Sequence, residues 1–594
     1  MKKIIIAFIA LAGVACPLMA QWNTDPAVNT FVAGSQEDRL YPQIAITPQG
    51  NFFVSNWHAV PDTNINFNMW LQLVDANGYP KWGTDGIQIS RNPSRSWISY
   101  YGMAVDTAGR AVIAIEDYHG NTGHSHVSIY SRDQNGHPVW DSAGIQLYYG
   151  DNDSYSPNIG LTRKNNSIVT WIVNLAVNDQ EKNFILFGKY SPTGEALWSN
   201  PKGIPGDDST TMFSWVTPVG QDDFILFWLH KYYVHSGMGG MWYTYILAQR
   251  YDPDGNTVWP QPARICDLGD SANRVVGFLR LTPVVDPDDG VYIAWFDDRY
   301  QTDYFNIYIQ HVDVNGNLRW AQNGIPVSPY NEGFNRYEPY IALDTLNGQL
   351  TVFWSEDRDV GIYLASGICG QKFDPAGNLL WGDSTRIIRP FSLDSSYFAM
   401  YADIIPPHDT YLQFAATIDS IIGPDTILIS QLFGTRLNSD GIPQWSPPIK
   451  GISLTAAAKY HPMTISAPGL MHVTAWSENR DSLFASYGSI YVQNILYDGN
   501  IGPVGVKEPA VPANSARIYP NPATKDAWLR CDLEGLAVIT ILGLNGQPVA
   551  ELGTVHLSPG QPFRIGTGDL RPGLYLVRIT TAEKTVTLKL ITAL

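Results

Sequence analysis

A tryptophan four residues after a glycine recurs along the chain at nearly constant spacing, and this repeat limits the possible folds more than any other feature. The first copy reads VDANGYPKWGTDGIQIS at residues 74–90. A regular period of this length predicts an array of like units, each packed on its neighbours. The copies place the pair at Gly78 and Trp82, Gly136 and Trp140, Gly194 and Trp198, Gly255 and Trp259, Gly316 and Trp320, Gly377 and Trp381, and Gly441 and Trp445.

Each repeat favours four short strands, because its segments alternate polar with apolar residues or are rich in β-branched ones. In the first repeat these segments are residues 42–47, 52–57, 68–75 and 86–90. The pair Asn77-Gly78 suits a tight type I′ hairpin. Asp75 is placed to accept hydrogen bonds from the amides of that turn, and Trp82 to fill the space between neighbouring sheets. The repeated phrase is therefore interpreted as architecture.

Four-stranded units repeated around an axis describe a β-propeller, and an open row of them would leave two exposed edges. The last repeat, around Gly499, is not followed by a tryptophan strand, whereas QWNTDPAVNT at 21–30 parallels KWGTDGIQIS at 81–90. We therefore predict an all-β chain with an eight-bladed propeller, a seven-bladed one being the alternative. Residues 21–32 would complete the last blade, which resembles the strand-exchange closure of many propellers.

Three further segments flank or follow the repeats. Residues 1–20 begin with two lysines and continue with an apolar stretch, which is typical of a secretory signal peptide. The propeller is predicted to span residues 21–503, and residues 504–516, rich in proline and small residues, to form a linker. Residues 517–594 alternate in polarity between glycine turns, which predicts a small C-terminal β-sandwich.

The C-terminal stretch closely resembles the sorting domain of type IX secretion substrates. Its motif residues are Tyr519, Pro520, Asn521, Pro522, Gly573 and Tyr575. The resemblance implies that residues 517–594 engage the type IX secretion machinery. It also implies export through the periplasm and the outer membrane, so that the protein is secreted or attached to the bacterial cell surface. One departure is the ending Thr-Ala-Leu, where many members finish on a basic residue.

Composition excludes several partners. The formal charge of −17 repels phosphate backbones, so no nucleic acid is expected. After residue 20 no apolar run is long enough to span a membrane. Cys16 lies in the predicted signal peptide, where lipid attachment is the alternative. The other cysteines, Cys266, Cys369 and Cys531, are widely spaced and predict free thiols. No phosphate-binding, dinucleotide or zinc motif is found, and neither a cofactor nor a metal is predicted.

Two classes of function remain. A non-catalytic binding or adhesion module for extracellular glycan or protein is favoured, because no catalytic constellation is visible. The alternative is an extracellular hydrolase or lyase that acts on polysaccharide or peptide with its site in the propeller loops. A second phrase, WFDDR at 295–299, WSEDR at 354–358 and WSENR at 476–480, is expected to form local ion pairs, with ligand contact as the alternative.

Loop lengths place the predicted binding face. Gly220 and Gly255 lie 35 residues apart, against 28 between Gly50 and Gly78, so extra chain enters the connection HKYYVHSGMGGMWYT at 230–244. A loop has no core to fill, so its aromatic groups favour contact with a partner, with packing over the channel mouth as the alternative. The candidate ligand-binding residues are His58, Tyr118, His119, His230, Tyr232, Tyr233, His235 and Trp242.

Overall fold

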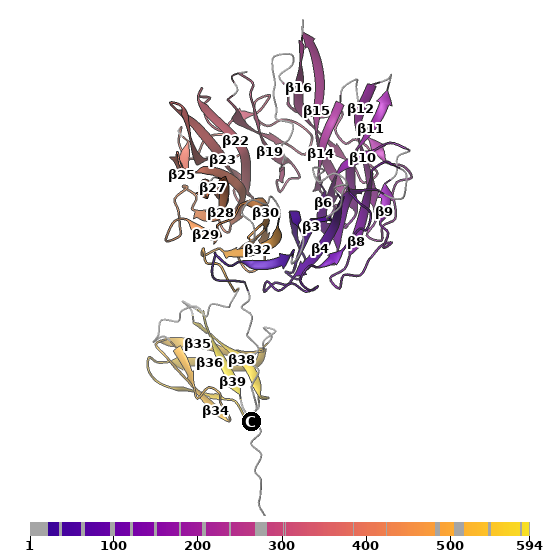
Figure 1. Cartoon of the computed structure of the whole chain (residues 1–594). Coiled ribbons are helices and arrows are strands. Elements are labelled where there is room, and N and C mark those ends of the chain that lie inside the picture. Colours follow the sequence, from indigo (N-terminus) through magenta and orange to yellow (C-terminus); the bar gives the residue numbers. More distant parts are fainter. Residues whose placement is uncertain are drawn as a thin grey trace, which may run out of the picture. The chain divides into compact units, whose positions relative to one another are not determined.

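The structure is a computed structural model of the whole chain, and its described residues form strands without a helix. The chain divides into two compact units, Met1–Val504 and Gly505–Leu594 (Figure 1). The structure describes residues 22–34, 38–60, 66–94, 101–118, 123–147, 151–177, 180–204, 210–236, 239–267, 282–300, 302, 304–383, 385–422, 425–480, 488–503, 516–543, 548–568, 570–581 and 585–592. The predicted signal peptide and most of the predicted linker lie outside these residues.

Seven sheets of the first unit each take four consecutive antiparallel strands. Their strands are β2 (Arg39–Ile46), β3 (Phe52–Val60), β4 (Asn66–Val74), β5 (Ile87–Gln88); β6 (Gly102–Val105), β7 (Ala111–Asp117), β8 (His126–Arg132), β9 (Ile145–Leu147); β10 (Ser154–Leu161), β11 (Ser167–Val177), β12 (Gln180–Tyr190), β13 (Lys202–Gly203); β14 (Thr210–Val219), β15 (Asp223–Ser236), β16 (Gly239–Tyr251), β17 (Ala263–Cys266); β18 (Val284–Val285), β19 (Val291–Asp297), β20 (Asn306–Val312), β21 (Ile325–Pro326); β22 (Phe334–Asp344), β23 (Gln349–Val360), β24 (Tyr363–Phe373), β25 (Arg386–Ser392); and β26 (Ser396–Ile405), β27 (Asp409–Ile422), β28 (Asp425–Leu437), β29 (Lys450–Ser453).

A further sheet of this unit joins the two ends of the unit. It has the order β1-β32-β31-β30, with β1 at Thr30–Ala33, β30 at Lys459–Ala467, β31 at Met471–Glu478 and β32 at Ser489–Leu496. In the antiparallel pairing Thr30 lies opposite Val492 and Phe31 opposite Tyr491. The N-terminal strand is therefore the fourth strand of a sheet whose other strands come from the end of the unit.

The sheets lie around a common centre, and the first strand of each is the inner one (Figure 1). Inner strands pack on one another in order, β2 on β6, β6 on β10, β10 on β14 and, farther along, β22 on β26. β30, the first strand of the last sheet, packs on β2, the first strand of the first sheet. One apolar cluster, which includes Phe52, Val54, Val473 and Val492, fills the seam between the sheets of β2 and β30.

The repeated tryptophans and glycines meet across the seams between sheets. Each tryptophan ring lies where a side chain on the glycine of the next copy would be, as Trp259 does at Gly316, where a Cβ would come 2.6 Å from the ring. Gly316 also has φ +86, which disfavours any side chain. Trp22 makes the same contact with Gly78, and its Nε1 donates to Ala76 O at 3.0 Å. The contact recurs from Trp445 to Gly499.

The aspartate of the repeated phrase closes its hairpin as predicted. Asp313 Oδ1 accepts hydrogen bonds from the backbone amides of Asn315 and Asn317, each at 2.9 Å. The same pair of bonds occurs at Asp75, Asp133, Asp252 and Asp374. Hydrogen bonds from Asn378 lower the pKa of Asp374, because they favour the charged carboxylate. The carboxylates of these aspartates are therefore engaged in hydrogen bonds within their own turns.

The second unit contains two sheets that share one apolar cluster. One sheet has the order β33-β34-β37 and the other β36-β35-β38-β39. The strands are β33 (Ala516–Tyr519), β34 (Asp526–Cys531), β35 (Gly535–Leu542), β36 (Pro548–Leu557), β37 (Phe563–Gly566), β38 (Gly573–Thr581) and β39 (Thr585–Thr592). Leu529 from the first sheet and Ile539, Val577 and Leu590 from the second are fully buried in the cluster. Cys266, Cys369 and Cys531 are buried free thiols, as predicted.

Candidate functional site

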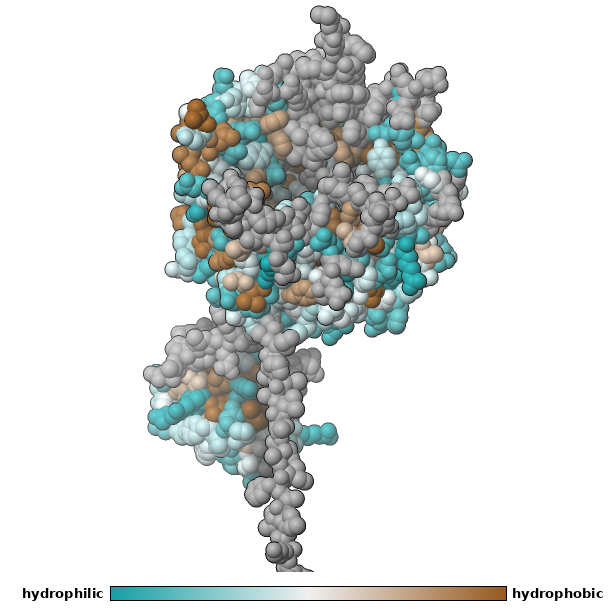
Figure 2. Space-filling view, viewed as in Figure 1, coloured by the Kyte–Doolittle hydropathy of each residue, from teal (hydrophilic) through white to brown (hydrophobic). Residues whose placement is uncertain are grey.

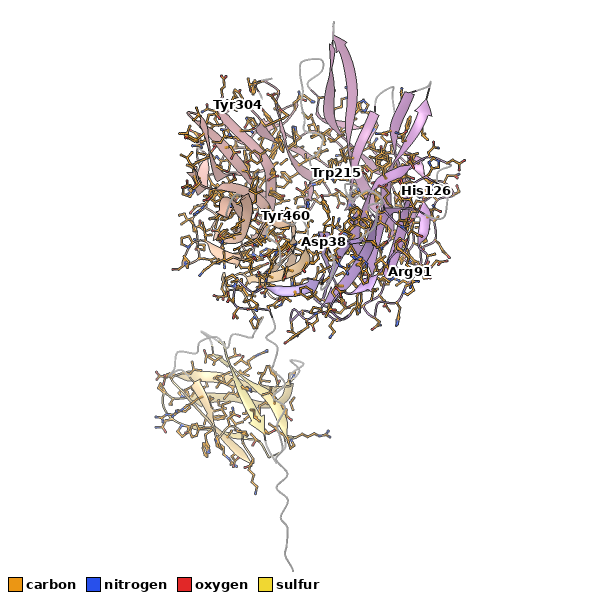
Figure 3. The ribbon with its side chains drawn as sticks, viewed as in Figure 1. Asp38, Arg91, His126, Trp215, Tyr304 and Tyr460 are labelled. Carbon is orange, nitrogen blue, oxygen red and sulfur yellow. The ribbon has the colours of Figure 1, made fainter. Side chains whose placement is uncertain are left out.

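The antiparallel order gives every sheet of the first unit two ends, and these form two rims. We call the end that carries the glycines of the repeated phrase the turn rim. We call the opposite end the connection rim, since it carries the connections between second and third strands and the links from one sheet to the next. Figure 3 shows Asp38, Trp215 and Tyr460 near the middle of the ring and Tyr304 at its upper left edge.

The longest connection was predicted at residues 230–244, and the structure corrects the predicted loop there. β15 and β16 continue through it as a paired hairpin, with Tyr233 opposite Trp242 and His235 opposite Gly240. The physical reason is composition, since the segment is rich in tyrosine and other residues that favour strands and hairpin pairing satisfies their backbone groups. The side chains of Tyr232, Tyr233, His235 and Trp242 lie outside the described residues, so their contact with a ligand stays a prediction.

The other candidate ligand-binding residues differ in their position in the fold and in their burial. His58 lies within β3 and His230 within β15, and both side chains are buried, so the loop placement predicted for them is wrong. The His58 ring lies edge-on to Trp70, with centroids 5.8 Å apart. Tyr118 is half-buried just after β7, and His119 lies outside the described residues. The structure does not gather these residues into one site among the positions it describes.

The acid–arginine phrases form local ion pairs, as predicted. Asp297 is buried and accepts hydrogen bonds from Trp295 Nε1 at 2.9 Å and Arg299 Nη2 at 2.7 Å. The Arg299 guanidinium lies over the ring of Tyr308, 3.1 Å from its centroid. Equivalent contacts join Glu356 to Trp354 and Arg358, and Glu478 to Trp476 and Arg480. Each acid binds the arginine and tryptophan of its own strand end, and Glu356 also accepts a hydrogen bond from Arg336 of β22 at 2.8 Å. These contacts brace the connection rim.

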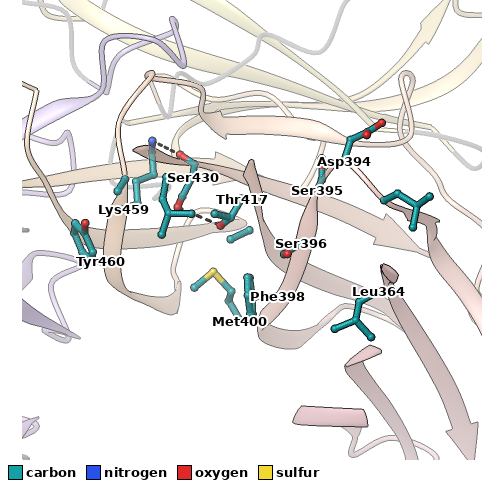
Figure 4. Close-up of a pocket in the computed structure, with 14 residues that line it drawn as sticks. Leu364, Asp394, Ser395, Ser396, Phe398, Met400, Thr417, Ser430, Lys459 and Tyr460 are labelled. Atoms are coloured by element: carbon teal, nitrogen blue, oxygen red, sulfur yellow. Dashed lines mark hydrogen bonds between the residues drawn. The ribbon is translucent and has the colours of Figure 1, made fainter. Parts of the chain in front are cut away.

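A pocket of about 690 Å³ opens among β24, β26, β27, β28 and β30 (Figure 4). Its lining combines apolar side chains with hydroxyl groups. These residues begin the inner strand β26, end β27 and begin β28, which places the pocket at the connection rim. The lining includes Leu364, Leu393, Asp394, Ser395, Ser396, Phe398, Met400, Thr417, Leu428, Ser430, Lys459 and Tyr460.

Lys459 is the one lysine of the pocket lining, and its ammonium group is occupied. Nζ donates to the carbonyl oxygens of Ser430 at 2.6 Å, Thr455 at 3.1 Å and Ala457 at 3.3 Å. Glu478 Oε1 lies 3.9 Å away, and burial lowers the pKa of Lys459 to about 8. Because its donors bind backbone carbonyls, Lys459 ties β28 to the segment that precedes β30.

A second group of residues was missed by sequence reasoning. Near the start of several inner strands a non-glycine residue adopts positive φ beside a break in the pairing register, as a β-bulge does. These residues are Tyr41, Ser156, Phe213, Glu338 and His461. All except Phe213 directly precede a proline, and this recurring dipeptide was the available signal.

Three of these bulge residues, Tyr41, Glu338 and His461, carry titratable side chains. Glu338 is half-buried, and burial raises the pKa of its carboxyl to about 7. The His461 ring stacks on Tyr41, with centroids 3.7 Å apart, and so joins β30 to β2. Strained backbone of this kind persists only where its surroundings hold it, and it often marks functional positions.

Comparison with known proteins identifies the end of the chain. Residues 517–593 match the family model of the secretion system C-terminal sorting domain. The chain therefore carries a type IX sorting domain, and the protein is exported, to be secreted or attached to the cell surface. None of the curated proteins matches this sequence. In the described part of the chain no helix is long and apolar enough to cross a membrane.

Several solved structures are similar to the chain at low identity. A protein of unknown function from Dyadobacter fermentans is 10% identical with a TM-score of 0.36, over 79% of this chain and 98% of that one. An α-L-arabinanase from Penicillium chrysogenum, complexed with arabinobiose, is 10% identical with a TM-score of 0.31, over 68% and 93% of the chains. An ulvan lyase is 11% identical with a TM-score of 0.38, over 70% and 96%.

Proposed function

We propose that residues 21–503 form an eight-bladed β-propeller that acts outside the cell as a non-catalytic binding module for glycan or protein. Support for the eight blades comes from the sheet completed by β1 and from the contact of Trp22 with Gly78, which repeats the contact between every pair of neighbouring copies. Residues 517–594 deliver the module through the type IX machinery, and residues 504–516 link the two parts.

One observation carries the proposed function, namely the pocket on the connection rim. It is large enough for several side chains or sugar rings, and its wall combines apolar groups with hydroxyls. Glu356 is paired with Arg358 and Arg336, Glu478 is paired with Arg480, and Lys459 donates to backbone carbonyls. Hydrogen bonds hold these groups in fixed positions, which suits them to shape the wall of a binding site.

The test blocks the pocket with a bulky side chain. It then measures both the retention of the protein on a ligand and the turnover of that ligand. Ser396 is exposed at the pocket wall, so Ser396→Trp should block the pocket without disturbing the core. Ser199→Trp, at an exposed position between Trp198 and β13, is the matched control. The purified protein is incubated with insoluble glycans and with extracellular proteins. Loss of retention in Ser396→Trp alone supports the proposal, and equal retention by both variants overturns the pocket as the site.

A second candidate function rests on Glu338. A carboxyl group whose pKa lies near 7 is suited to act as a general acid, which a glycan hydrolase or lyase needs. If the protein is such an enzyme, Glu338→Gln should abolish turnover of a cleaved glycan while retention persists. Turnover that survives this substitution would exclude Glu338 as the acid.

A further inference from the structure

The hairpin between β23 and β24 ends in an apolar tip that faces solvent. Val360 pairs with Tyr363, so Gly361 and Ile362 form the turn. Ile362 is 91% exposed and Tyr363 63% exposed. Figure 2 shows brown, apolar surface at the upper left, over the region where Figure 1 labels β22, β23 and β25. Large apolar side chains grouped on a protein surface mark an interaction site more often than isolated ones do.

This tip is continuous with the pocket. Leu364, two residues after Ile362, is 60% exposed and lines the pocket together with Leu393 and Leu428, both more than half exposed. We define the apolar crest as Val360, Ile362, Tyr363, Leu364, Leu393 and Leu428. The crest forms one lip of the pocket, so a ligand seated in the pocket would lie against both.

Charged side chains of both signs lie beside the crest. Asp359 and Asp394 are exposed, and Asp359 accepts a hydrogen bond from Tyr304, whose pKa is raised by that bond. Arg358 is paired with Glu356 and lies over Phe391, 3.7 Å from the ring centroid. Arg389 donates to Tyr397 at 3.0 Å. Arg358 shares the Glu356 carboxylate with Arg336, and Arg389 binds a neutral hydroxyl, so these arginines keep positive charge near the crest. The excess of negative charge belongs to the chain as a whole, whose formal charge is −17.

These features select one kind of occupant. Sugar rings stack on flat aromatic faces, whereas five of the six crest residues are aliphatic and suit the apolar side chains of a polypeptide. A second copy of the chain is disfavoured, because each copy carries a formal charge of −17 and the two would repel. The net negative charge of the whole chain favours basic over acidic flanks in a partner. We propose that the crest and pocket dock an extracellular polypeptide segment whose bulky apolar residues are flanked by lysine or arginine.

This inference rests on the proposed binding function and names its ligand class. The probe is a fluorescein-labelled peptide with a Leu-Phe-Leu centre between runs of lysine, and binding to the full-length protein is followed by fluorescence anisotropy at physiological salt. Two further peptides serve for comparison, one with glutamate in place of lysine and one with serine in place of the apolar centre. We expect both to bind at least roughly tenfold more weakly than the probe.

The variant is the double substitution Ile362→Ser with Leu364→Ser, which should raise the Kd of the lysine-flanked probe at least roughly tenfold. Leu346→Ser is the matched control, because Leu346 is 73% exposed on the turn rim between β22 and β23. It should leave the Kd unchanged. Thermal unfolding of all three proteins checks that they are folded.

Each result decides between the two proposals. An unchanged Kd in the double variant, or no binding of the lysine-flanked probe, overturns the inference. A glycan whose retention is blocked by Ser396→Trp but not by the double variant also overturns it, and leaves the proposed binding function standing. If no glycan, protein or peptide is retained by the wild-type chain, the binding function itself fails.

Discussion

On the turn rim of the first unit the same contact recurs at every seam, as Trp320 on Gly377 and Trp381 on Gly441 illustrate. On the connection rim the sheets differ. β23 and β24 are joined by only Gly361 and Ile362, whereas β15 and β16 extend as a hairpin well beyond the length of β19 and β20. Residues that must fit the next sheet are bound to repeat, while residues that face solvent are free to vary. The turn rim therefore has an architectural role, and the variability of the connection rim supports our proposal that recognition takes place there.

The largest expected effect comes from removing the tryptophan that closes the ring. Trp22 is fully buried, so Trp22→Ala should lower the free energy of unfolding by ~4 kcal/mol, through lost apolar burial and the cavity left beside Gly78. Denaturant titration of the variant measures the change. Trp528→Ala in the second unit, where Trp528 is 38% exposed, is the control and should cost much less. Equal losses would refute the special role of the turn rim.

The stability of the protein should depend on pH through Glu338 on the inner strand β22. The pKa of Glu338 rises from an ordinary 4.5 to about 7, so the folded chain holds the proton more tightly than the unfolded chain. Below pH 4.5 both states are protonated and Glu338→Gln should match the wild type. As the pH rises to 7 the wild type loses stability relative to the variant, by up to ~3 kcal/mol. Unfolding titrations at acid and alkaline pH that give a constant difference would contradict this.

Substitutions at two glycines with positive φ distinguish the cost of backbone strain from the cost of a steric clash. Both Gly316→Ala and Gly361→Ala force a side chain into an unfavourable conformation, at φ +86 and +66. Only at Gly316 does the new Cβ meet a tryptophan, since nothing lies within 4 Å at Gly361. Gly316→Ala should therefore cost ~2 kcal/mol more than Gly361→Ala. The melting temperatures of the two variants measure the difference. Equal values would mean that the Trp259 ring moves aside at little cost in stability.

The smallest effect on stability is expected on the crest. Ile362 has almost no protein around it, so Ile362→Ser should change the free energy of unfolding by less than ~0.5 kcal/mol. Denaturant titration checks this, with Leu350→Ser as the contrast because Leu350 is fully buried. A large loss in Ile362→Ser would show that the tip packs against another part of the protein.

The turn rim could be predicted from the sequence because its determinants are local. The glycine, the aspartate and the tryptophan of each copy lie within a few residues of one another, and the copy around Trp22 could be aligned with the one around Trp82. What the spacing does not reveal is that each tryptophan reaches the glycine of the next copy, since that contact depends on how sheets stack.

The connection rim was harder to predict for physical reasons. Residues 230–244 contain glycines that suggest a loop, yet their tyrosines let the hairpin continue. The sequence around Ile362 is typical of an ordinary strand, and its exposure arises because none of the described sheets covers it. Glu338 is unremarkable in sequence until the bulge in β22 places it among protein atoms that raise its pKa. Burial decided by tertiary packing is not encoded in local pattern.

Melting curves and probe-binding isotherms measured on Gly316→Ala and Ile362→Ser test the division between the rims most directly. The lysine-flanked peptide serves as the probe, and the full-length wild type as the reference. The account predicts that Gly316→Ala lowers the melting temperature and leaves the Kd of the folded protein unchanged, while Ile362→Ser raises the Kd and leaves the melting temperature unchanged. If either variant changes both quantities, architecture and recognition are not divided between the two rims.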